Sequence, residues 1–233
     1  MGRMYTDFAP FYDVVQGGVA EAFAGWIERR AGESNLEVGS VLELGCGTGA
    51  VLELLPSDWT KVGVDVSPEM LEIARTKGVD AELVEADIRS LSLSRTFDLV
   101  VCVYDTINHL PGSEWPAVFA GAAAHLVEGG AFLFDMNTLG RLRRDSGEPH
   151  STEAEGTTVL MRIDDAGGDR FDWHVRIERE GTVVEDVISE HAVPLATVRA
   201  MLADAGFTRV EVSGGQGVPV DDDARRLFFV CRR

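Results

Sequence analysis

The chain has 233 residues, 39 acidic and 21 basic, which gives a formal net charge of −18 at pH 7. Affinity for nucleic acid comes mainly from Lys and Arg that neutralise phosphates, so this charge argues against a DNA or RNA partner. No run of 18 apolar residues or signal-peptide pattern occurs, and three well-separated cysteines are expected to be reduced. We therefore expect a cytoplasmic protein without a membrane partner.

The first part of the chain predicts helices followed by alternating strands and helices. Apolar positions between Phe8 and Arg30 recur at helical spacing with a break at Gly17 and Gly18, which indicates two helices. Beyond them, short apolar runs alternate with helical patterns, as in a parallel sheet buried on both faces. The predicted strands begin at Ser40 and then cover 62–65, 81–84, 97–103 and 131–135. The predicted helices cover 50–55, 67–77 and 113–126, the last followed by a turn at 128–130.

The pattern changes after Asn137. Residues 157–163, 170–179 and 182–190 alternate apolar and polar side chains, which predicts a small antiparallel sheet. A helix at 195–205 and strands at 207–212 and 226–232 then return to the main sheet. We expect an α/β, Rossmann-like fold: a seven-stranded, mostly parallel sheet with helices on both faces, an antiparallel last strand and a small inserted antiparallel sheet.

Three alternating glycines, Gly45, Gly47 and Gly49, lie between the first predicted strand and its helix. Glycine permits positive φ and lets a ligand lie against the backbone, while the helix start supplies free N–H groups for a carboxylate or another anion. Gly45, Gly47 and Ala50 also satisfy the looser dinucleotide pattern G-x-G-x-x-G/A, so the glycines alone leave a nicotinamide cofactor open.

Two acidic residues follow the next strands. Asp65 ends the second predicted strand, 22 residues after Glu43, where its carboxylate can accept hydrogen bonds from both ribose hydroxyls of an adenosine. Asp87, followed by Ile88, comes after the third strand, where it can accept from the exocyclic amine of the adenine. This arrangement suits any adenosine cofactor.

Several blocks resemble the class I S-adenosylmethionine-dependent methyltransferases: residues 41–49, 62–71, 86–88, 97–101 and 126–130. The resemblance implies S-adenosylmethionine as cofactor, with Glu43 and the glycines at its methionine part, Asp65 at the ribose, and Asp87 with Ile88 at the adenine. It implies one methyltransferase domain, with a helical cap (1–37), a cofactor-binding core (38–138), an inserted lid (139–193) and a completion of the core (194–233). The expected cofactor-binding residues are Tyr12, Glu43, Gly45, Cys46, Gly47, Gly49, Asp65, Val66, Met70, Asp87, Ile88 and Val103.

A narrower resemblance, to bacterial small-molecule methyltransferases such as the amino-sugar N,N-dimethyltransferases, rests on residues 8–13, Asn108-His109-Leu110, the inserted sheet and residues 226–230. It implies an N-terminal aromatic segment over the cofactor, for which Tyr5 and Tyr12 are candidates, and an inserted sheet that walls a small-molecule acceptor. The Asn/Asp-Pro-Pro-Tyr/Phe motif of base-flipping amino-methyltransferases is absent after the fourth strand.

The segment after the fourth strand carries the catalytic candidates Tyr104, Asp105 and His109, because ligands of open α/β sheets bind beyond the carboxyl ends of the strands. An amine must lose its proton before it attacks, and a histidine with a pKa of about 6.5 suits that task. We expect N-methylation of a small amine first and O-methylation second.

Three other functions remain open: a nicotinamide-dependent oxidoreductase, a non-catalytic S-adenosylmethionine-binding module, and a different reaction of the sulfonium. No Cys or His pair stands at metal-ligand spacing, so no metal is predicted, and the sequence leaves a homodimer open.

Overall fold

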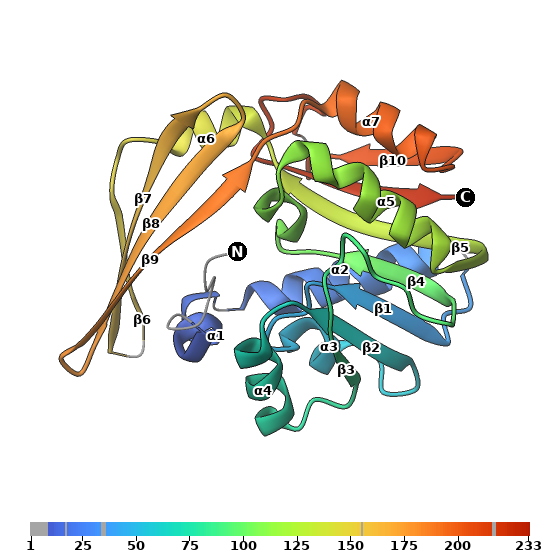
Figure 1. Cartoon of the computed structure of the whole chain (residues 1–233), viewed down its shortest axis with the longest axis horizontal. Coiled ribbons are helices and arrows are strands. Elements are labelled where there is room, and N and C mark those ends of the chain that lie inside the picture. The colour runs from blue at the N-terminus through green and yellow to red at the C-terminus, as the bar shows by residue number, and fades with distance from the viewer. Residues whose placement is uncertain (1–8, 17, 34–35, 155, 216–217) are drawn as a thin grey trace.

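A computed structural model describes residues 9–16, 18–33, 36–154, 156–215 and 218–233; Tyr5 lies outside them. The described residues form a seven-stranded sheet and a separate four-stranded sheet, which stands beyond the carboxyl ends of the parallel strands (Figure 1). No described helix is long and apolar enough to cross a membrane.

The seven-stranded sheet has the order β10-β11-β5-β4-β1-β2-β3. β1 pairs in parallel with both β2 and β4, so the chain changes direction of winding at β1 and leaves a crevice at the carboxyl ends of β1 and β4. β11 is antiparallel to both of its neighbours, which confirms the predicted fold class. The strands are β1 (Ser40–Leu44), β2 (Thr60–Asp65), β3 (Glu82–Glu85), β4 (Phe97–Cys102), β5 (Leu126–Asn137), β10 (Arg209–Ser213) and β11 (Arg226–Arg232).

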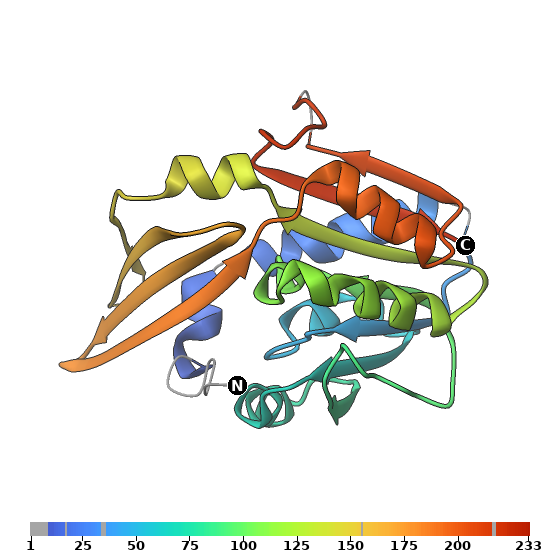
Figure 2. The ribbon, with the colours of Figure 1, turned by 45° about the horizontal axis from the view of Figure 1, so that its top comes forward.

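Helices cover both faces of this sheet (Figure 2). One apolar cluster includes Trp115 of α5 and Leu202 of α7, and the other includes Ile27 of α2 and Leu71 of α4. Strand side chains alternate between the two clusters, as expected for strands buried on both faces. The helices are α1 (Tyr12–Gln16), α2 (Val19–Glu33), α3 (Ala50–Leu54), α4 (Pro68–Lys77), α5 (Trp115–Ala124), α6 (Leu139–Asp145) and α7 (Leu195–Asp204), with short 3-10 turns η1 (Ala9–Phe11), η2 (Thr106–His109) and η3 (Gly112–Glu114).

The second sheet, here called the lid sheet, consists of β6 (His150–Ala154), β7 (Thr157–Gly167), β8 (Arg170–Arg179) and β9 (Thr182–His191), all antiparallel. Val159, Val175 and Ile188 form an apolar cluster on it, against which Phe11 and Tyr12 pack. The N-terminal segment therefore touches the lid sheet as well as the core.

The structure differs from the sequence-based expectation most clearly at one turn and at two unpredicted elements. The predicted turn at 128–130 lies inside β5, where the pairing of β4 with β5 shifts register between Phe97 and Leu99 and Gly129 takes a φ of 80°. The glycine pair forms a bulge rather than a turn. Helix α6 and strand β6 were not predicted, because α6 buries only Leu142 and β6 has a polar sequence without alternation.

Candidate functional site

The glycine loop follows β1 at the crevice. The N–H groups of Gly45 and Cys46 both donate to the carbonyl of Val64, at 2.7 and 3.0 Å, which fixes the loop against β2. Gly45, Gly47 and Gly49 all have φ between 53° and 74°. A Cβ on Gly47 would meet no atom within 4 Å, so its face is open to a ligand. A Cβ on Gly45 would stand 2.3 Å from the Thr106 side chain, so this position has room only for glycine.

Gly49 has a packing role, and its expected contact with the cofactor stays a prediction. A Cβ there would approach the side chains of Val79 and Ala74 at 3.1 to 3.4 Å, and none of the three cavities described below is lined by Gly49. Cys46 lines a cavity, but its thiol lies in the core against Gly63, and burial raises its pKa. Gly49 thus serves the packing of α3 against α4.

Asp65 organises the other side of the loop. Its Oδ2 accepts from the N–H of Gly47 and its Oδ1 from the N–H of Ser67, both at 2.8 Å. Burial raises the pKa of this carboxyl, and those backbone donors oppose the rise. Each carboxylate oxygen has further lone pairs, so Asp65 can hold the loop and still accept from a ligand.

Glu43 is a buried acid without a complete set of partners. The residue is 3% exposed, and its Oε2 has no hydrogen-bond partner among the described residues. Burial and the nearby Asp65 raise its pKa well above the ordinary value. Leaving such a group unpaired is costly, so Glu43 is suited to accept from a ligand donor.

Three adjoining cavities lie around these residues. The strand-end cavity, about 120 Å³, is lined among others by Gly47, Asp65, Val66, Met70, Asp87 and Ile88. The glycine-loop cavity, about 370 Å³, is lined among others by Glu43, Gly45, Cys46, Thr48, Lys77 and Val103. The lid cavity, about 280 Å³, lies between the core and the lid sheet and is lined among others by Asp105, His109, Arg141, Trp173, Glu190 and Arg226.

Tyr12 and Tyr104 line all three cavities, and His109 lines both the strand-end and the lid cavity. The Tyr104 ring packs 4.9 Å from that of Phe23, and its hydroxyl is buried without a partner among the described residues. Burial and the charge of Asp105 raise the pKa of Tyr104. These three side chains thus form the junction between the cavities.

Asp87 lines the strand-end cavity, although its carboxylate is already engaged. Both oxygens accept from the Arg89 guanidinium, and this hydrogen bonding holds its pKa below the ordinary value. Arg89 also bonds Glu114 at 2.8 Å. The role of Asp87 toward an adenine amine stays a prediction, and any such bond would share the carboxylate with Arg89.

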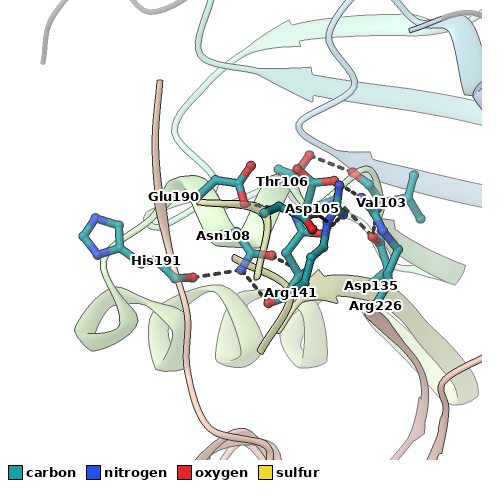
Figure 3. Close-up of polar contacts among 11 residues, drawn as sticks. Val103, Asp105, Thr106, Asn108, Asp135, Arg141, Glu190, His191 and Arg226 are labelled. Carbon is teal, nitrogen blue, oxygen red and sulfur yellow. Dashed lines mark hydrogen bonds and ion pairs between the residues drawn. The ribbon is translucent and has the colours of Figure 1, made fainter. Parts of the chain in front are cut away.

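Asp105 belongs to a buried charge cluster that the sequence did not predict. Arg226 of β11 donates to Asp105 at 2.5 Å and also to Asp135 of β5, which is fully buried (Figure 3). The N–H of Asp105 donates to Asp135 at 3.1 Å. Burial raises the pKa of Asp135 to about 6, against the opposing charge of Arg226. Asp105 is thus held in place by Arg226 and by its backbone bond to Asp135, and its expected role as proton acceptor stays a prediction.

Asn108 joins the lid sheet to the core. Its Nδ2 donates to the carbonyls of Asn137 and His191, at 3.1 and 2.8 Å, and its Oδ1 accepts from the N–H of Asn137 at 2.9 Å (Figure 3).

The next residue, His109, has a pKa below its ordinary value, chiefly because of burial, which the charge of Asp105 opposes. Its imidazole is therefore neutral at pH 7.

The structure brings together Tyr12, Tyr104 and His109 with Glu43, Asp65, Val66, Met70, Ile88 and Val103 around connected cavities. Their roles toward ligands remain predictions. Sequence reasoning missed Thr106, Asp135, Asn137 and Glu190, and did not assign Arg226 to this site. Asp135 carried a usable signal, because it is an acidic residue within an otherwise apolar buried run. No group of acidic, His or Cys side chains in the described ranges is arranged to hold a metal.

The described residues fit S-adenosylmethionine. The open face of Gly47 and the unsatisfied oxygen of Glu43 suit an amino-acid part, and Asp65 lines the strand-end cavity together with Met70 and Ile88. The ionised form of Glu43 is complementary to an ammonium donor, and the positive charge of that donor would favour the ionised form.

Comparisons with known proteins give the same assignment. The family described as "Methyltransferase domain" matches residues 41–130. The chain is 34% identical over 188 residues to the dTDP-3-amino-3,4,6-trideoxy-alpha-D-glucopyranose N,N-dimethyltransferase of Streptomyces venezuelae, covering 77% of this chain and 79% of the relative. It is 29% identical to the cypemycin N-terminal methyltransferase of a Streptomyces species, covering 95% of this chain and 94% of that one.

A further relative, the dTDP-3-amino-3,6-dideoxy-alpha-D-glucopyranose N,N-dimethyltransferase of Streptomyces fradiae, is 32% identical, but the match covers 55% of this chain and only 52% of that protein. Among solved structures, the DesVI protein of Streptomyces venezuelae superposes with a TM-score of 0.82 at 26% identity, covering 98% of this chain and 99% of that one.

Proposed function

This chain belongs to the S-adenosylmethionine-dependent methyltransferase family, and we propose that it methylates an amine nitrogen of a small molecule. The observation that carries the proposal is the lid cavity, which adjoins the strand-end cavity at Tyr12, Tyr104 and His109 and is lined by the carboxyl groups of Asp105 and Glu190. A carboxyl group in the wall of such a cavity can accept a hydrogen bond or a proton from an amine.

The relatives support nitrogen as the attacked atom. By their names, one modifies an amino sugar attached to a nucleotide and another the N-terminus of a peptide. These acceptors differ in everything except the amine. This pattern fits a site in which the core residues bind the amine and the lid sheet contacts the rest of the acceptor.

The proposed mechanism relies on positioning. S-adenosylmethionine supplies a methyl group on a sulfonium, and the chain would hold it with Glu43, Asp65 and the backbone of the glycine loop. Tyr12, Tyr104 and His109 line the junction of the two cavities, where the acceptor nitrogen would meet that methyl group. Effective molarities of about 10⁵ M or more are available from aligning two bound reactants.

A panel of matched acceptors tests this proposal. The purified chain is incubated with S-adenosylmethionine and either dTDP-3-amino-3,4,6-trideoxyglucose, its 3-hydroxy counterpart, or a short peptide with a free or an acetylated N-terminus. Formation of S-adenosylhomocysteine and a methylated product is followed by mass spectrometry. We expect transfer to at least one free amine and none to the hydroxyl or acetylated controls.

Other outcomes identify the alternatives. Transfer only to the hydroxyl compound would make the protein an O-methyltransferase. Cofactor binding without turnover of any acceptor would indicate a binding module, and release of methylthioadenosine would indicate a different reaction of the sulfonium.

We also propose that the protein works in the cytoplasm, does not act on nucleic acid and forms a homodimer. The three cysteines are free and buried, which suits a reducing compartment. The charge of −18 disfavours phosphate backbones. Leu160, Val183 and Val187 expose 41 to 48% of their surface on the lid sheet, which suits contact with a second copy. Light scattering that gives a mass near the monomer's 25.3 kDa would exclude the dimer.

A further inference from the structure

One acidic residue of the lid sheet belongs to the buried wall of the lid cavity. Glu190 of β9 is 3% exposed and lies two residues after Ile188, so both side chains are on the same face of the strand. Around it, the lid sheet contributes Met161, Trp173, Val175 and Ile188 to the same cavity. Burying a carboxyl group in such a wall costs free energy unless the group has hydrogen-bond partners.

Two residues from the core hold Glu190 in one orientation. Arg141 of α6 donates through Nη1 to Oδ1 of Asn137, and Asn137 donates through Nδ2 to Oε2 of Glu190 at 2.8 Å. A guanidinium can only donate hydrogen bonds, so the side of the Asn137 amide that faces Arg141 must be its oxygen. The amide nitrogen of Asn137 therefore faces Glu190. The guanidinium of Arg141 also lies 6.0 Å from the ring centroid of Trp173.

This arrangement gives the two oxygens of Glu190 different tasks. Oε2 receives the hydrogen bond from Asn137, which leaves Oε1 available for a proton or for a ligand. Figure 3 shows Glu190 beside Asn108 and Asp105, at the level where the lid sheet meets the residues after β4. Its carboxyl group therefore stands at the boundary between lid and core.

The charged groups around Glu190 come from several elements. Asp105 follows β4, Arg141 is on α6 and Arg226 on β11, while Asp135 on β5 and His109 on η2 lie close to the same cluster. Burial and the charge of Asp105 raise the pKa of Glu190 to about 8, against the effects of Asn137, Arg141 and Arg226. Glu190 thus holds a proton at neutral pH and releases it slightly above.

We propose that Glu190, oriented by Asn137 and Arg141, accepts the proton of the acceptor ammonium in the lid cavity. This inference rests on the proposed function, because it requires an amine acceptor. In the step, one N–H bond of the ammonium breaks and an O–H bond forms at Oε1. The positive charge of the nitrogen and the negative charge of the carboxylate both disappear, and the nitrogen keeps the electron pair needed for attack.

The two proton acceptors in the cavity are not equivalent. Amines have pKa values of about 8 for an α-amino group and about 10 for an alkyl amine. A carboxyl group with a pKa of about 8 can take such a proton at little cost, whereas His109, with a lowered pKa, is a much weaker base. Glu190 is therefore the better match, and His109 serves to position the acceptor.

The test compares Glu190→Gln with wild type on dTDP-3-amino-3,4,6-trideoxyglucose. Gln keeps an oxygen for the Asn137 hydrogen bond, so the cavity should retain its shape. Glu185→Gln, on the same strand but with a 68% exposed side chain, is the control. We expect Glu190→Gln to lower kcat/KM about 10²-fold near pH 8, and Glu185→Gln to leave it within about twofold.

The pH profile separates proton transfer from a structural effect. Wild type needs the ionised carboxylate to take the proton of the ammonium, so its kcat/KM should rise up to pH about 8 and then level off. Glu190→Gln can use only the fraction of acceptor that is already a neutral amine, so its kcat/KM should keep rising up to the pKa of the acceptor amine. Glu190→Asp, which keeps a carboxyl group, should restore a plateau that begins below the pKa of the amine.

The outcomes distinguish this inference from the proposed function. If wild type methylates no amine, the proposed function fails and Glu190 loses this role with it. If wild type methylates amines while Glu190→Gln keeps its kcat/KM, or loses rate but retains the wild-type pH profile, then the inference about Glu190 alone is overturned. Circular dichroism checks that each variant is folded.

Discussion

The rings of Tyr12 and Tyr104, with centroids 6.5 Å apart, meet where the strand-end, glycine-loop and lid cavities join. One ring comes from helix α1 and the other from the residue that follows Val103 after β4. Tyr104 has a φ of 66° and Asp105 one of 49°, which are rare values for residues with a side chain. Such backbone conformations cost about 1 to 3 kcal/mol and concentrate at functional sites. The cavity junction is therefore built on backbone that Phe23 and Arg226 hold in place.

Removing the Tyr104 hydroxyl should affect binding and not folding. The hydroxyl is buried without a partner among the described residues, so Tyr104→Phe should leave the free energy of unfolding unchanged or slightly higher. If the hydroxyl bonds a ligand, the variant should lose about tenfold in affinity for the cofactor or the acceptor. Calorimetric titration measures both affinities; unchanged values would show that Tyr104 acts only through its ring.

Asp65→Ala should weaken S-adenosylmethionine binding. The carboxylate holds the N–H groups of Gly47 and Ser67 and is expected to accept from the ribose, and each charge-assisted bond is worth about 1.5 to 3 kcal/mol. We expect the Kd to rise tenfold or more in calorimetry. Asp80→Ala, which removes an exposed acid before β3, is the control for the change in net charge. Equal affinities in the two variants would contradict the assignment of Asp65.

His109→Ala should raise the KM of the acceptor about tenfold with a smaller change in kcat, because positioning at the junction is lost while Glu190 remains. His150→Ala, an exposed histidine of β6, is the control. The cofactor Kd should stay near wild type. If the variant instead turns over about 10²-fold more slowly while the KM is unchanged, His109 is the proton acceptor.

Arg226→Ala should destabilise the protein strongly. Arg226 pairs with Asp105 and with the fully buried Asp135, and removing one partner of a buried ion pair costs about 3 to 5 kcal/mol. Its neighbour Arg225, with a 75% exposed side chain paired to Asp145, is the matched control, expected to cost about 0 to 1 kcal/mol. Urea unfolding measures both. Similar losses would mean that the buried cluster contributes no more than a surface pair.

Glu190 should make stability depend on pH. Its pKa in the folded protein, about 8, lies above the unfolded value of about 4.3, so the folded protein binds this proton more tightly. The resulting stabilisation is fully present below pH about 4, declines as the pH rises and is lost above pH about 8. The free energy of unfolding should therefore fall over this range in wild type and in Glu185→Gln, relative to Glu190→Gln. Parallel pH curves for all three proteins would show that Glu190 has an ordinary pKa.

The main sheet was predictable because its information is local. Buried strands read as apolar runs, the glycine loop as spaced glycines, and the start of α4 as Ser67 followed by Pro68, which the structure confirms through the bond from the N–H of Met70 to Ser67. The bulge at Gly129 was not predictable in this way. The glycine pair resembles a turn, and only the close approach of Gly130 to the carbonyl of Asp98 shows why glycine is needed inside β5.

The candidate site was predictable only in part, for the same reason. Glu43, Asp65 and His109 follow from their places at strand ends. The partners of Asp105 do not, because Arg226 is 121 residues away and Asp135 is on another strand. The hydrogen bonds from Arg141 to Asn137 and from Asn137 to Glu190 could not be predicted either, because these residues lie on three different elements. Contacts of this kind depend on tertiary pairing that no short motif records.

Asn108 ties the lid sheet to the core. If β9 moved away from the core, the hydrogen bond from Nδ2 of Asn108 to the carbonyl of His191 would break. On the N-terminal side of the site, Asp13 of α1 contacts Thr48 and Lys77. The Asp13 and Lys77 side chains are 41% and 26% exposed, so ions in the solvent can screen this pair. Salt should therefore weaken the contacts of Asp13 with the core, while the bonds of Asn108 to Asn137 and His191 are largely shielded from it.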